Sequence, residues 1–183
     1  MTKMKIKPWY AAVEAFGPKS GDVWDNFIKE SGLKQLKEVV TLDGILCPDI
    51  IEELTPEDWK HNVPEDYVFF YFRDLDYLLR RIGSQYGVNI LALVRNPDEE
   101  CGNQYISDDF IFQGYDLIDI GGSNSALTNC GGFEKAFSNE ELSSVGLLST
   151  LNRAIEVQNL LKGNYPDEPH ANCNIWAIWK MKR

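Results

Sequence analysis

YVFFYFRDLDYLLRRIGSQYGVNILALV, residues 67–94, is the stretch that decides which fold to expect for this chain. It opens with an aromatic run of strand length, residues 67–72, and it closes with a second apolar run, residues 88–94. Between these runs, leucines recur at the spacing of one helix face, and glycines follow where that helix should end. The order strand, helix, strand predicts a right-handed parallel crossover if both strands belong to one sheet.

The rest of the chain adds strands and helices in an order that contains no repeated unit. Further strands are expected at residues 5–10, 36–42, 110–120 and 173–182, with a bulge or a hairpin corner at Gly114. Further helices are expected from Asp22, from Thr55, after Ser138, and over residues 148–162. This order predicts a single globular α+β domain over residues 1–183, with a mixed or mostly antiparallel sheet and packed helices.

Composition predicts a soluble protein with a packed core. Of the 183 residues, 44% are apolar and 12% are aromatic, which is typical of globular domains. No apolar run approaches the roughly 20 residues needed to span a bilayer, and no apolar segment follows the basic N-terminus as in a signal peptide. We therefore expect a cytoplasmic protein without membrane association. The four cysteines are far apart and are expected to be reduced.

Acidic side chains are concentrated in the middle of the chain. The formal net charge is −10, and residues 41–120 alone hold 17 acidic and 5 basic side chains, a net charge of −12. Such a segment repels phosphates and has no basic stripe to release counterions, so nucleic-acid binding is not expected. A basic protein partner suits this charge better. The sequence gives no indication of the oligomeric state.

TNCGGF, residues 128–133, places a thiol directly before two glycines. A cysteine nucleophile needs a neighbouring base and donors for an oxyanion. Cys130 would be the nucleophile, and the backbone N–H groups of the two glycines would be the oxyanion donors. His170 would be the base, with Asn172 or Asp167 orienting its imidazole. The favoured alternative is architectural: the glycines supply positive φ angles for a turn, and Cys130 is a small buried side chain.

Metal and phosphate sites find less support in the sequence. His170 and Cys173 have the H-x-x-C spacing of one zinc-ligand pair, but structural zinc sites normally present two such pairs. The glycine-rich residues 121–125 lack the lysine of a phosphate-binding loop. Asp116 and Asp119 lie at an odd separation in an expected strand, so they should face opposite sides of the sheet. No metal and no cofactor are therefore predicted.

In size and acidity the chain resembles the small immunity and inhibitor proteins of bacteria, which cover a basic toxin surface. The resemblance implies a non-catalytic domain that presents an acidic surface to a basic protein partner. The contact is expected within the acidic residues 41–120, at Asp98, Glu99 and Glu100 in a polar loop of residues 96–102 and at Asp108 and Asp109. The alternative is a cysteine-dependent hydrolase or transferase that uses Cys130 and His170.

Overall fold

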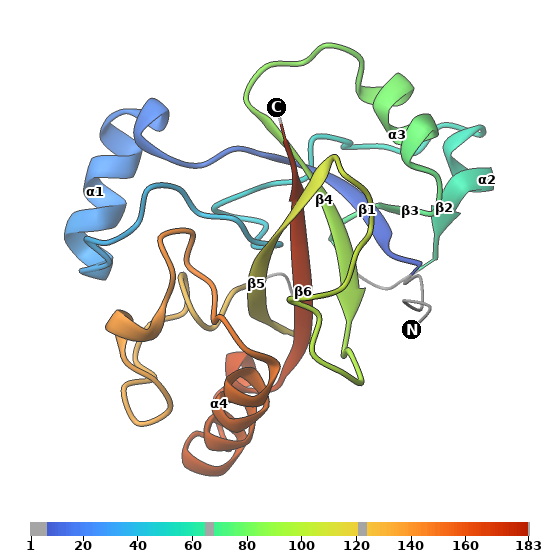
Figure 1. Cartoon of the computed structure of the whole chain (residues 1–183). Coiled ribbons are helices and arrows are strands. Elements are labelled where there is room, and N and C mark those ends of the chain that lie inside the picture. Colours follow the sequence, from blue (N-terminus) through green and yellow to red (C-terminus); the bar gives the residue numbers. More distant parts are fainter. Residues whose placement is uncertain (1–6, 65–67, 121–123, 183) are drawn as a thin grey trace.

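The computed structural model describes residues 7–64, 68–120 and 124–182, and its centre is one antiparallel sheet of six strands. The strands follow the order β2–β3–β1–β4–β6–β5 across the sheet (Figure 1). Their bounds are Trp9–Glu14 (β1), Asn62–Val63 (β2), Tyr71–Phe72 (β3), Val88–Arg95 (β4), Phe110–Asp119 (β5) and Cys173–Met181 (β6). The predicted α+β class is therefore confirmed.

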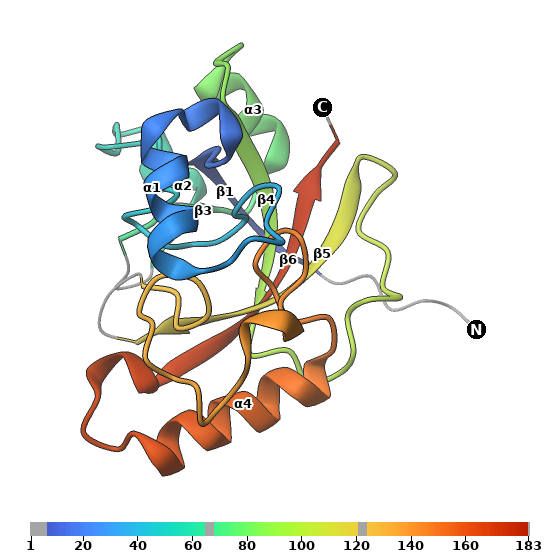
Figure 2. The same cartoon turned by 90° about the vertical axis from the view of Figure 1, so that its left-hand side faces the viewer.

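Four α-helices surround the sheet in the described part of the chain (Figures 1 and 2). They are α1 (Asp22–Ser31), α2 (Asp58–His61), α3 (Leu75–Ile82) and α4 (Leu151–Asn164), and three short 3₁₀ helices are η1 (Pro18–Ser20), η2 (Asn139–Glu141) and η3 (Pro169–Ala171). The Asp74 side chain caps the N-terminus of α3, and the Thr150 side chain caps that of α4. None of the described helices is both long enough and apolar enough to cross a membrane.

The predicted strand, helix and second strand correspond to β3, α3 and β4. Strand β1 lies between β3 and β4 and is antiparallel to both, so β3 and β4 are parallel and share one sheet. The first strand is shorter than expected, because the N–H of Phe70 donates to the Asp49 carboxylate at 2.7 Å instead of to a neighbouring strand. Tyr67 lies outside the described residues.

Two other expected elements differ from the structure. Residues 36–42 form no strand: the N–H groups of Val39 and Val40 donate to Phe16 and Val145, which belong to two different segments. Ser138 and Glu141 form the predicted capping box, but only the short 3₁₀ helix η2 follows it. The longer helix predicted over residues 148–162 is α4.

Gly114 forms the predicted bulge within β5, where the register with β6 shifts between Phe112 and Gly114. Its φ of 141° favours glycine, and an added Cβ would lie 2.5 Å from the Leu148 carbonyl oxygen. Leu148 and Ser125 make isolated bridges to Tyr115 and Ile118 of β5. These bridges hold residues 124–148 against the edge of the sheet.

Both faces of the sheet are covered, as the two tryptophans of β6 demonstrate. Trp176 packs against the rings of Trp9 and Tyr71, whereas Trp179 packs against the ring of Phe112. Because they are three residues apart in a strand, the two indoles lie on opposite faces. Their exposures are only 1% and 2%, and the buried apolar side chains form one continuous core.

Candidate binding cleft

A cleft of about 630 Å³ lies between the C-terminal part of α1 and residues 127–140. Phe27, Glu30 and Ser31 of α1 line one side, and residues 127–129, 131–134 and 137–140 supply most of the other side. In Figures 1 and 2, the lower end of α1 lies beside this later segment of the chain. The cleft uses every residue of the TNCGGF stretch except Cys130, which is not among the described residues that line it.

Glycines shape the wall formed by residues 127–140. Gly131 and Gly132 have φ angles of 64° and 76°, in the left-handed region that a side chain disfavours. An added Cβ at either glycine would meet no other atom within 4 Å. The requirement for glycine is therefore conformational, as the architectural interpretation of TNCGGF predicted, and the resulting turn presents backbone to the cleft.

Polar contacts hold the two walls of the cleft together. The Asn139 side chain donates from Nδ2 to the Ser31 carbonyl oxygen at 3.3 Å, and Gln35 donates from Nε2 to the Asn139 carbonyl oxygen at 2.5 Å. Behind the later wall, Arg153 of α4 donates to Glu141 at 2.6 Å and to the Ala136 carbonyl oxygen at 3.1 Å. Hydrogen bonds therefore join the two walls of the cleft to each other and join the later wall to α4.

The charge of the cleft is negative. Glu30, Glu134 and Glu140 come from three positions around it, all three are exposed, and none pairs with another described residue. The lining includes no lysine, arginine or histidine among the described residues. The carbonyl end of α1 adds partial negative charge at the same place. Phenylalanine side chains lie among these acids, and their ring faces also attract cations.

Two polar side chains of the cleft wall have an acceptor without a described donor, and only that of Asn129 belongs to a partly exposed side chain. Asn129 donates from Nδ2 to the buried Asp43 carboxylate at 2.9 Å, which fixes the amide and leaves its Oδ1 without a donor in the described chain. Thr128 is only 6% exposed, and its hydroxyl has no hydrogen-bond partner among the described residues. The Thr128 oxygen is itself enclosed by the protein, so its missing hydrogen bond lowers stability and does not offer a contact to a ligand in the cleft.

A buried carboxylate network supports Asn129 from below. Asp43 accepts from the N–H groups of Ile45, Leu46 and Ser125 at 2.9, 2.9 and 2.7 Å, in addition to Asn129. Burial raises the pKa of the neighbouring Asp116 to about 6, although it accepts hydrogen bonds from the hydroxyls of Thr41 and Ser125. The network fixes the backbone that leads into TNCGGF.

The proposed catalytic residues are not arranged as the sequence suggested. His170 Nδ1 lies 2.6 Å from Asp119 Oδ2, so the imidazole is oriented by Asp119 and not by Asn172 or Asp167. No hydrogen bond joins Cys130 to His170 in the described part of the chain. Burial and the negative charges of three aspartates raise the pKa of the Cys130 thiol to about 12.

A thiol with so high a pKa is protonated near neutral pH, which is the opposite of an activated nucleophile. Asp119 was missed as the partner of His170 because the two are 51 residues apart in the chain. Only the pairing of β5 with β6 at Asp119 and Cys173 brings them together.

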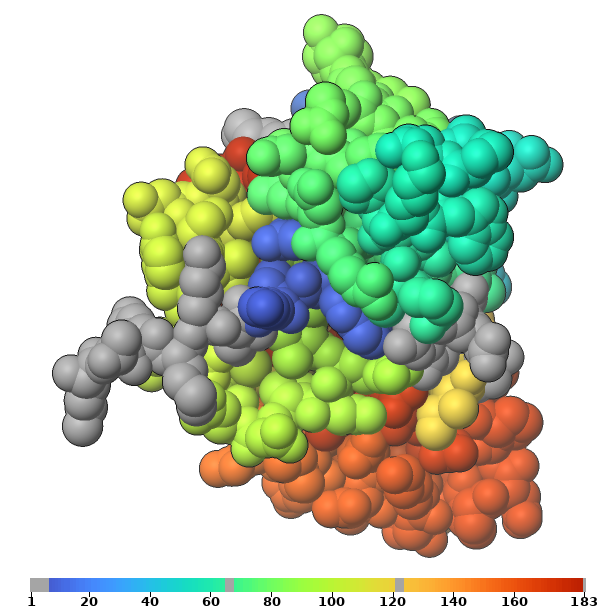
Figure 3. Space-filling view, turned by 90° about the vertical axis from the view of Figure 1, so that its right-hand side faces the viewer, coloured from blue at the N-terminus to red at the C-terminus, as the bar shows by residue number. Residues whose placement is uncertain are grey.

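The acids proposed to contact a partner lie elsewhere. Their loop, residues 96–109, runs along the side of the molecule away from α1, where Figure 3 shows it in yellow-green beside β1. Asp98, Glu99, Asp108 and Asp109 are exposed. Glu100 has a structural task, because its carboxylate accepts from the Tyr115 hydroxyl and, at 2.9 Å, from the first N–H of α4 at Leu151.

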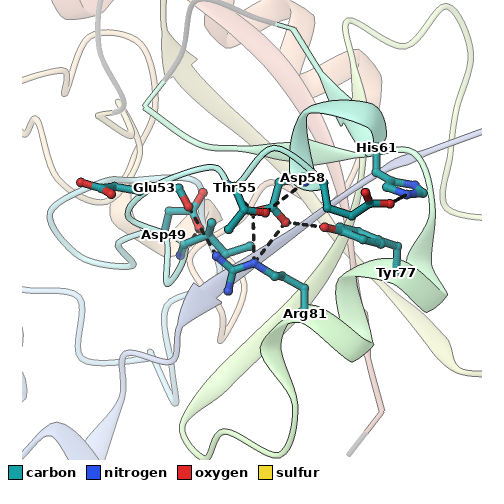
Figure 4. Close-up of polar contacts among 9 residues, drawn as sticks. Asp49, Glu53, Thr55, Asp58, His61, Tyr77 and Arg81 are labelled. Atoms are coloured by element: carbon teal, nitrogen blue, oxygen red, sulfur yellow. Dashed lines mark hydrogen bonds and ion pairs between the residues drawn. The ribbon is translucent and has the colours of Figure 1, made fainter.

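A separate ionic cluster joins α2 to α3 (Figure 4). Asp58 is fully buried and accepts from the Thr55 N–H at 2.7 Å, from the Tyr77 hydroxyl at 2.7 Å, and from Arg81 Nε at 3.1 Å. Burial by itself raises the pKa of Asp58, but the hydrogen bonds from Tyr77, Thr55 and Arg81 outweigh it and lower the pKa to about 2. Thr55, Tyr77 and Arg81 all donate to this one carboxylate, so the cluster links α2 to α3.

Comparison with known proteins adds no functional information. No protein-family model, no curated protein and no solved structure matches this chain. In the ranges that the structure describes, no three histidine, cysteine, aspartate or glutamate side chains are grouped so that they could hold a metal ion. Cys173 itself donates to the His170 carbonyl oxygen at 2.9 Å. The geometry of the cleft is therefore the basis for a functional proposal.

Proposed function

We propose that this chain is a non-catalytic binding domain whose acidic cleft receives a basic segment of a protein partner. One observation carries the proposal: Glu30, Glu134 and Glu140 converge on one cleft that has no basic residue in its described lining. Carboxylates at an exposed rim steer a positively charged partner and fix its orientation. Phe27, half-buried in the opposite wall, offers apolar area that a partner can cover.

The chemistry of the thiols supports binding over catalysis. Burial makes the largest contribution to the raised pKa of the Cys130 thiol, and nearby carboxylates raise this pKa further. The Asp119–His170 pair has the geometry of an oriented base, but no described hydroxyl or thiol donates to its imidazole. A cysteine-dependent hydrolase or transferase needs an activated thiol at that position.

A matched pair of variants tests the proposal. E30Q/E134Q/E140Q removes the three acidic charges of the cleft, and D98N/E99Q/D108N removes three of the five acidic charges of residues 96–109. Binding of fluorescent poly-L-lysine is measured by anisotropy at low salt. If each exposed contact contributes about 0.5 kcal/mol, the cleft variant binds roughly tenfold more weakly than the native protein.

The loop variant is expected to bind poly-L-lysine within about twofold of the native protein. The charges that it removes lie away from the cleft, and salt screens their attraction for a polycation bound there. An equal loss in both variants would mean that net charge, and not the cleft, attracts the polycation. A loss in the loop variant alone would move the binding surface to residues 96–109. Absence of binding by the native protein would contradict the proposal outright.

A further inference from the structure

We infer that the buried acids Asp43 and Asp116 hold one proton between them, and that this proton stabilises the turn of residues 125–130, which leads into the later wall of the cleft. The inference goes beyond the proposed function, because both acids are 0% exposed and neither is among the described residues that line the cleft. It is carried by the geometry of the acid pair and by its connection to the turn through Ser125.

The two carboxylates are joined through the same serine and the same threonine. Ser125 donates its N–H to Asp43 at 2.7 Å and its hydroxyl to Asp116 at 2.7 Å. Thr41 donates its hydroxyl to Asp116, and its oxygen accepts the N–H of Asp43 at 3.2 Å. Two negative charges that share a buried site disfavour each other, so a proton that neutralises one of them is favoured.

No cation compensates the two charges within the described residues. The groups that donate to Asp43 and Asp116 are backbone N–H groups, two hydroxyls and one amide, and no described lysine, arginine or histidine is among them. A buried charge without a partner of opposite sign is costly, which again favours the protonated form.

The other titratable groups around the pair add no positive charge of their own. They are three thiols and a third carboxylate: Cys47, Cys130, Cys173 and Asp119. Burial, followed by the nearby carboxylates, raises the pKa of the three thiols, so they are neutral near pH 7. Lys162 of α4 partly offsets this effect at Cys173, and His170 lies 2.6 Å from the Asp119 carboxylate.

Asp116 is the member of the pair that takes the proton. The groups that donate to Asp43 are N–H groups, which can only donate: Ile45, Leu46, Ser125 and the Asn129 side chain. Asp116 Oδ2 instead contacts the Thr41 hydroxyl, which can accept as well as donate, so a proton on Oδ2 keeps this hydrogen bond. Burial, together with the charge of Asp43, raises the pKa of Asp116 to about 6.

Ser125 connects the acid pair to the cleft wall. Its hydroxyl, which donates to Asp116, accepts the N–H groups of residues 127 and 128 at 3.2 and 3.3 Å. Its carbonyl oxygen accepts the N–H groups of residues 129 and 130, both at 3.0 Å. Four consecutive N–H groups therefore depend on the position of Ser125. Loss of the proton places a second charge beside Asp43, and opening of the turn relieves it by admitting water.

The raised pKa gives this linkage its sign and size. Asp116 has a pKa of about 6 in the fold and 3.8 as an ordinary aspartate, so the closed turn binds the proton more tightly than the open turn. The stabilisation is complete below pH 4 and is lost as pH rises through 6. The equilibrium constant for opening should therefore rise about tenfold between pH 5 and pH 7.

Amide hydrogen exchange measures this opening. Exchange in ¹⁵N-labelled full-length protein is followed by NMR at pH 5, 6 and 7, and each rate is divided by the intrinsic rate at that pH. The protection of the Asn129 and Cys130 amides, which donate to Ser125, should fall about tenfold between pH 5 and 7.

Two variants assign the effect to the pair. D116N places a neutral side chain of similar volume beside the Thr41 and Ser125 hydroxyls, which can accept from it. Protection of both amides should then vary by less than about twofold over the same pH range. D49N is the matched control, because it removes the other carboxyl whose pKa is raised to about 6, outside this network, and it should keep the tenfold change.

The native protein alone also decides the inference, through ¹³C NMR of its side-chain carboxyls. The Asp116 carboxyl should titrate with a midpoint near pH 6. A midpoint below about 4.5 would overturn the inference, as would constant protection of the two amides from pH 5 to 7. A pH dependence that is lost in D49N would overturn it too, because the amides would then report opening of the whole fold and not of the turn.

Discussion

Replacement of Asp58 by asparagine should remove a large part of the stability that joins α2 to α3. The Asp58 carboxylate is fully buried and accepts from Thr55, Tyr77 and Arg81 over distances of 2.7–3.2 Å. Asparagine keeps the volume but replaces one accepting oxygen by a donor, which then faces Thr55 and Arg81 without an acceptor. Breaking a buried ion pair costs about 3–5 kcal/mol, and because the Arg81 side chain is 34% exposed, the loss here should lie near the lower end of that range.

Part of that magnitude follows from proton linkage. The pKa of Asp58 is about 2 in the folded chain and about 3.8 for an ordinary aspartate, so the folded state binds the proton less tightly. At 1.36 kcal/mol per pKa unit, the charged carboxylate contributes about 2 kcal/mol at neutral pH. Since the folded pKa is lowered, this contribution is present above pH 4 and is lost as pH falls through 2.

The assay is equilibrium unfolding in urea, followed by tryptophan fluorescence, at several pH values from 7 down to 2. The native protein and D58N should differ by about 3 kcal/mol or more in unfolding free energy at pH 7, and the difference should shrink by about 2 kcal/mol toward pH 2. Asp49 and Asp116 have raised pKa values near 6, so their linkage has the opposite sign between pH 4 and 6. Because both proteins retain them, the difference between the proteins isolates Asp58.

E57Q is the matched control, because Glu57 is an exposed carboxylate directly before Asp58 and pairs with Lys60 at the surface. It should change the unfolding free energy by less than about 0.5 kcal/mol. Y77F removes one donor and leaves the charge, so it should cost about 1.5–3 kcal/mol and keep the acid dependence. A D58N variant as stable as E57Q, with an unchanged decline below pH 4, would refute the reasoning.

Three further predictions concern other parts of the chain. G114A should lower the free energy of unfolding in urea by about 2–4 kcal/mol, since its Cβ would lie 2.5 Å from the Leu148 carbonyl oxygen at a φ of 141°. G163A is the control in the last turn of α4, where an added Cβ would have no other atom within 4 Å. It should leave the free energy of unfolding unchanged or raise it by up to about 1 kcal/mol. T128V should keep or raise the unfolding free energy by up to about 1 kcal/mol, because it removes a buried hydroxyl without a partner; a loss above 1 kcal/mol would contradict that assignment. With a pKa near 12, the Cys130 thiol should react with iodoacetamide at pH 8 about 1,000-fold more slowly than a free cysteine. The labelling rate is measured by mass spectrometry. Rapid labelling of Cys130 at pH 6 would restore the catalytic alternative.

Local sequence patterns predicted much of the fold because local physics fixes those elements. Gly114 interrupts an apolar strand, and only a bulge fits it against Leu148. Ser138 and Glu141 satisfy each other's N–H groups within four residues. Residues 36–42 have the composition of a strand, but their N–H groups are divided between two partners that the sequence does not reveal.

The cleft could not be predicted, because distant segments of the chain form it. Asn139 contacts Ser31 across 108 positions of sequence, and Asn129 contacts Asp43 across 86. The TNCGGF stretch attracted attention for its thiol, whereas its threonine, asparagine and glycines line the cleft. Only the sheet, which holds residues 124–148 at its edge, brings these groups opposite α1.

Part of the acidic middle of the chain is buried, so the net charge of residues 41–120 overstates the acidic surface that they present. Asp43, Asp58, Asp116 and Asp119 belong to residues 41–120, but their exposures are 0%, 0%, 0% and 3%, so none forms a contact surface for a partner. Asp43 nevertheless sets the direction of the Asn129 amide at the cleft. The carboxylates that would meet a cation, Glu30, Glu134 and Glu140, come from outside that segment. A buried acid thus orients an amide within the fold, whereas the exposed carboxylates of the cleft come from other segments, so net charge by segment does not locate the acidic cleft.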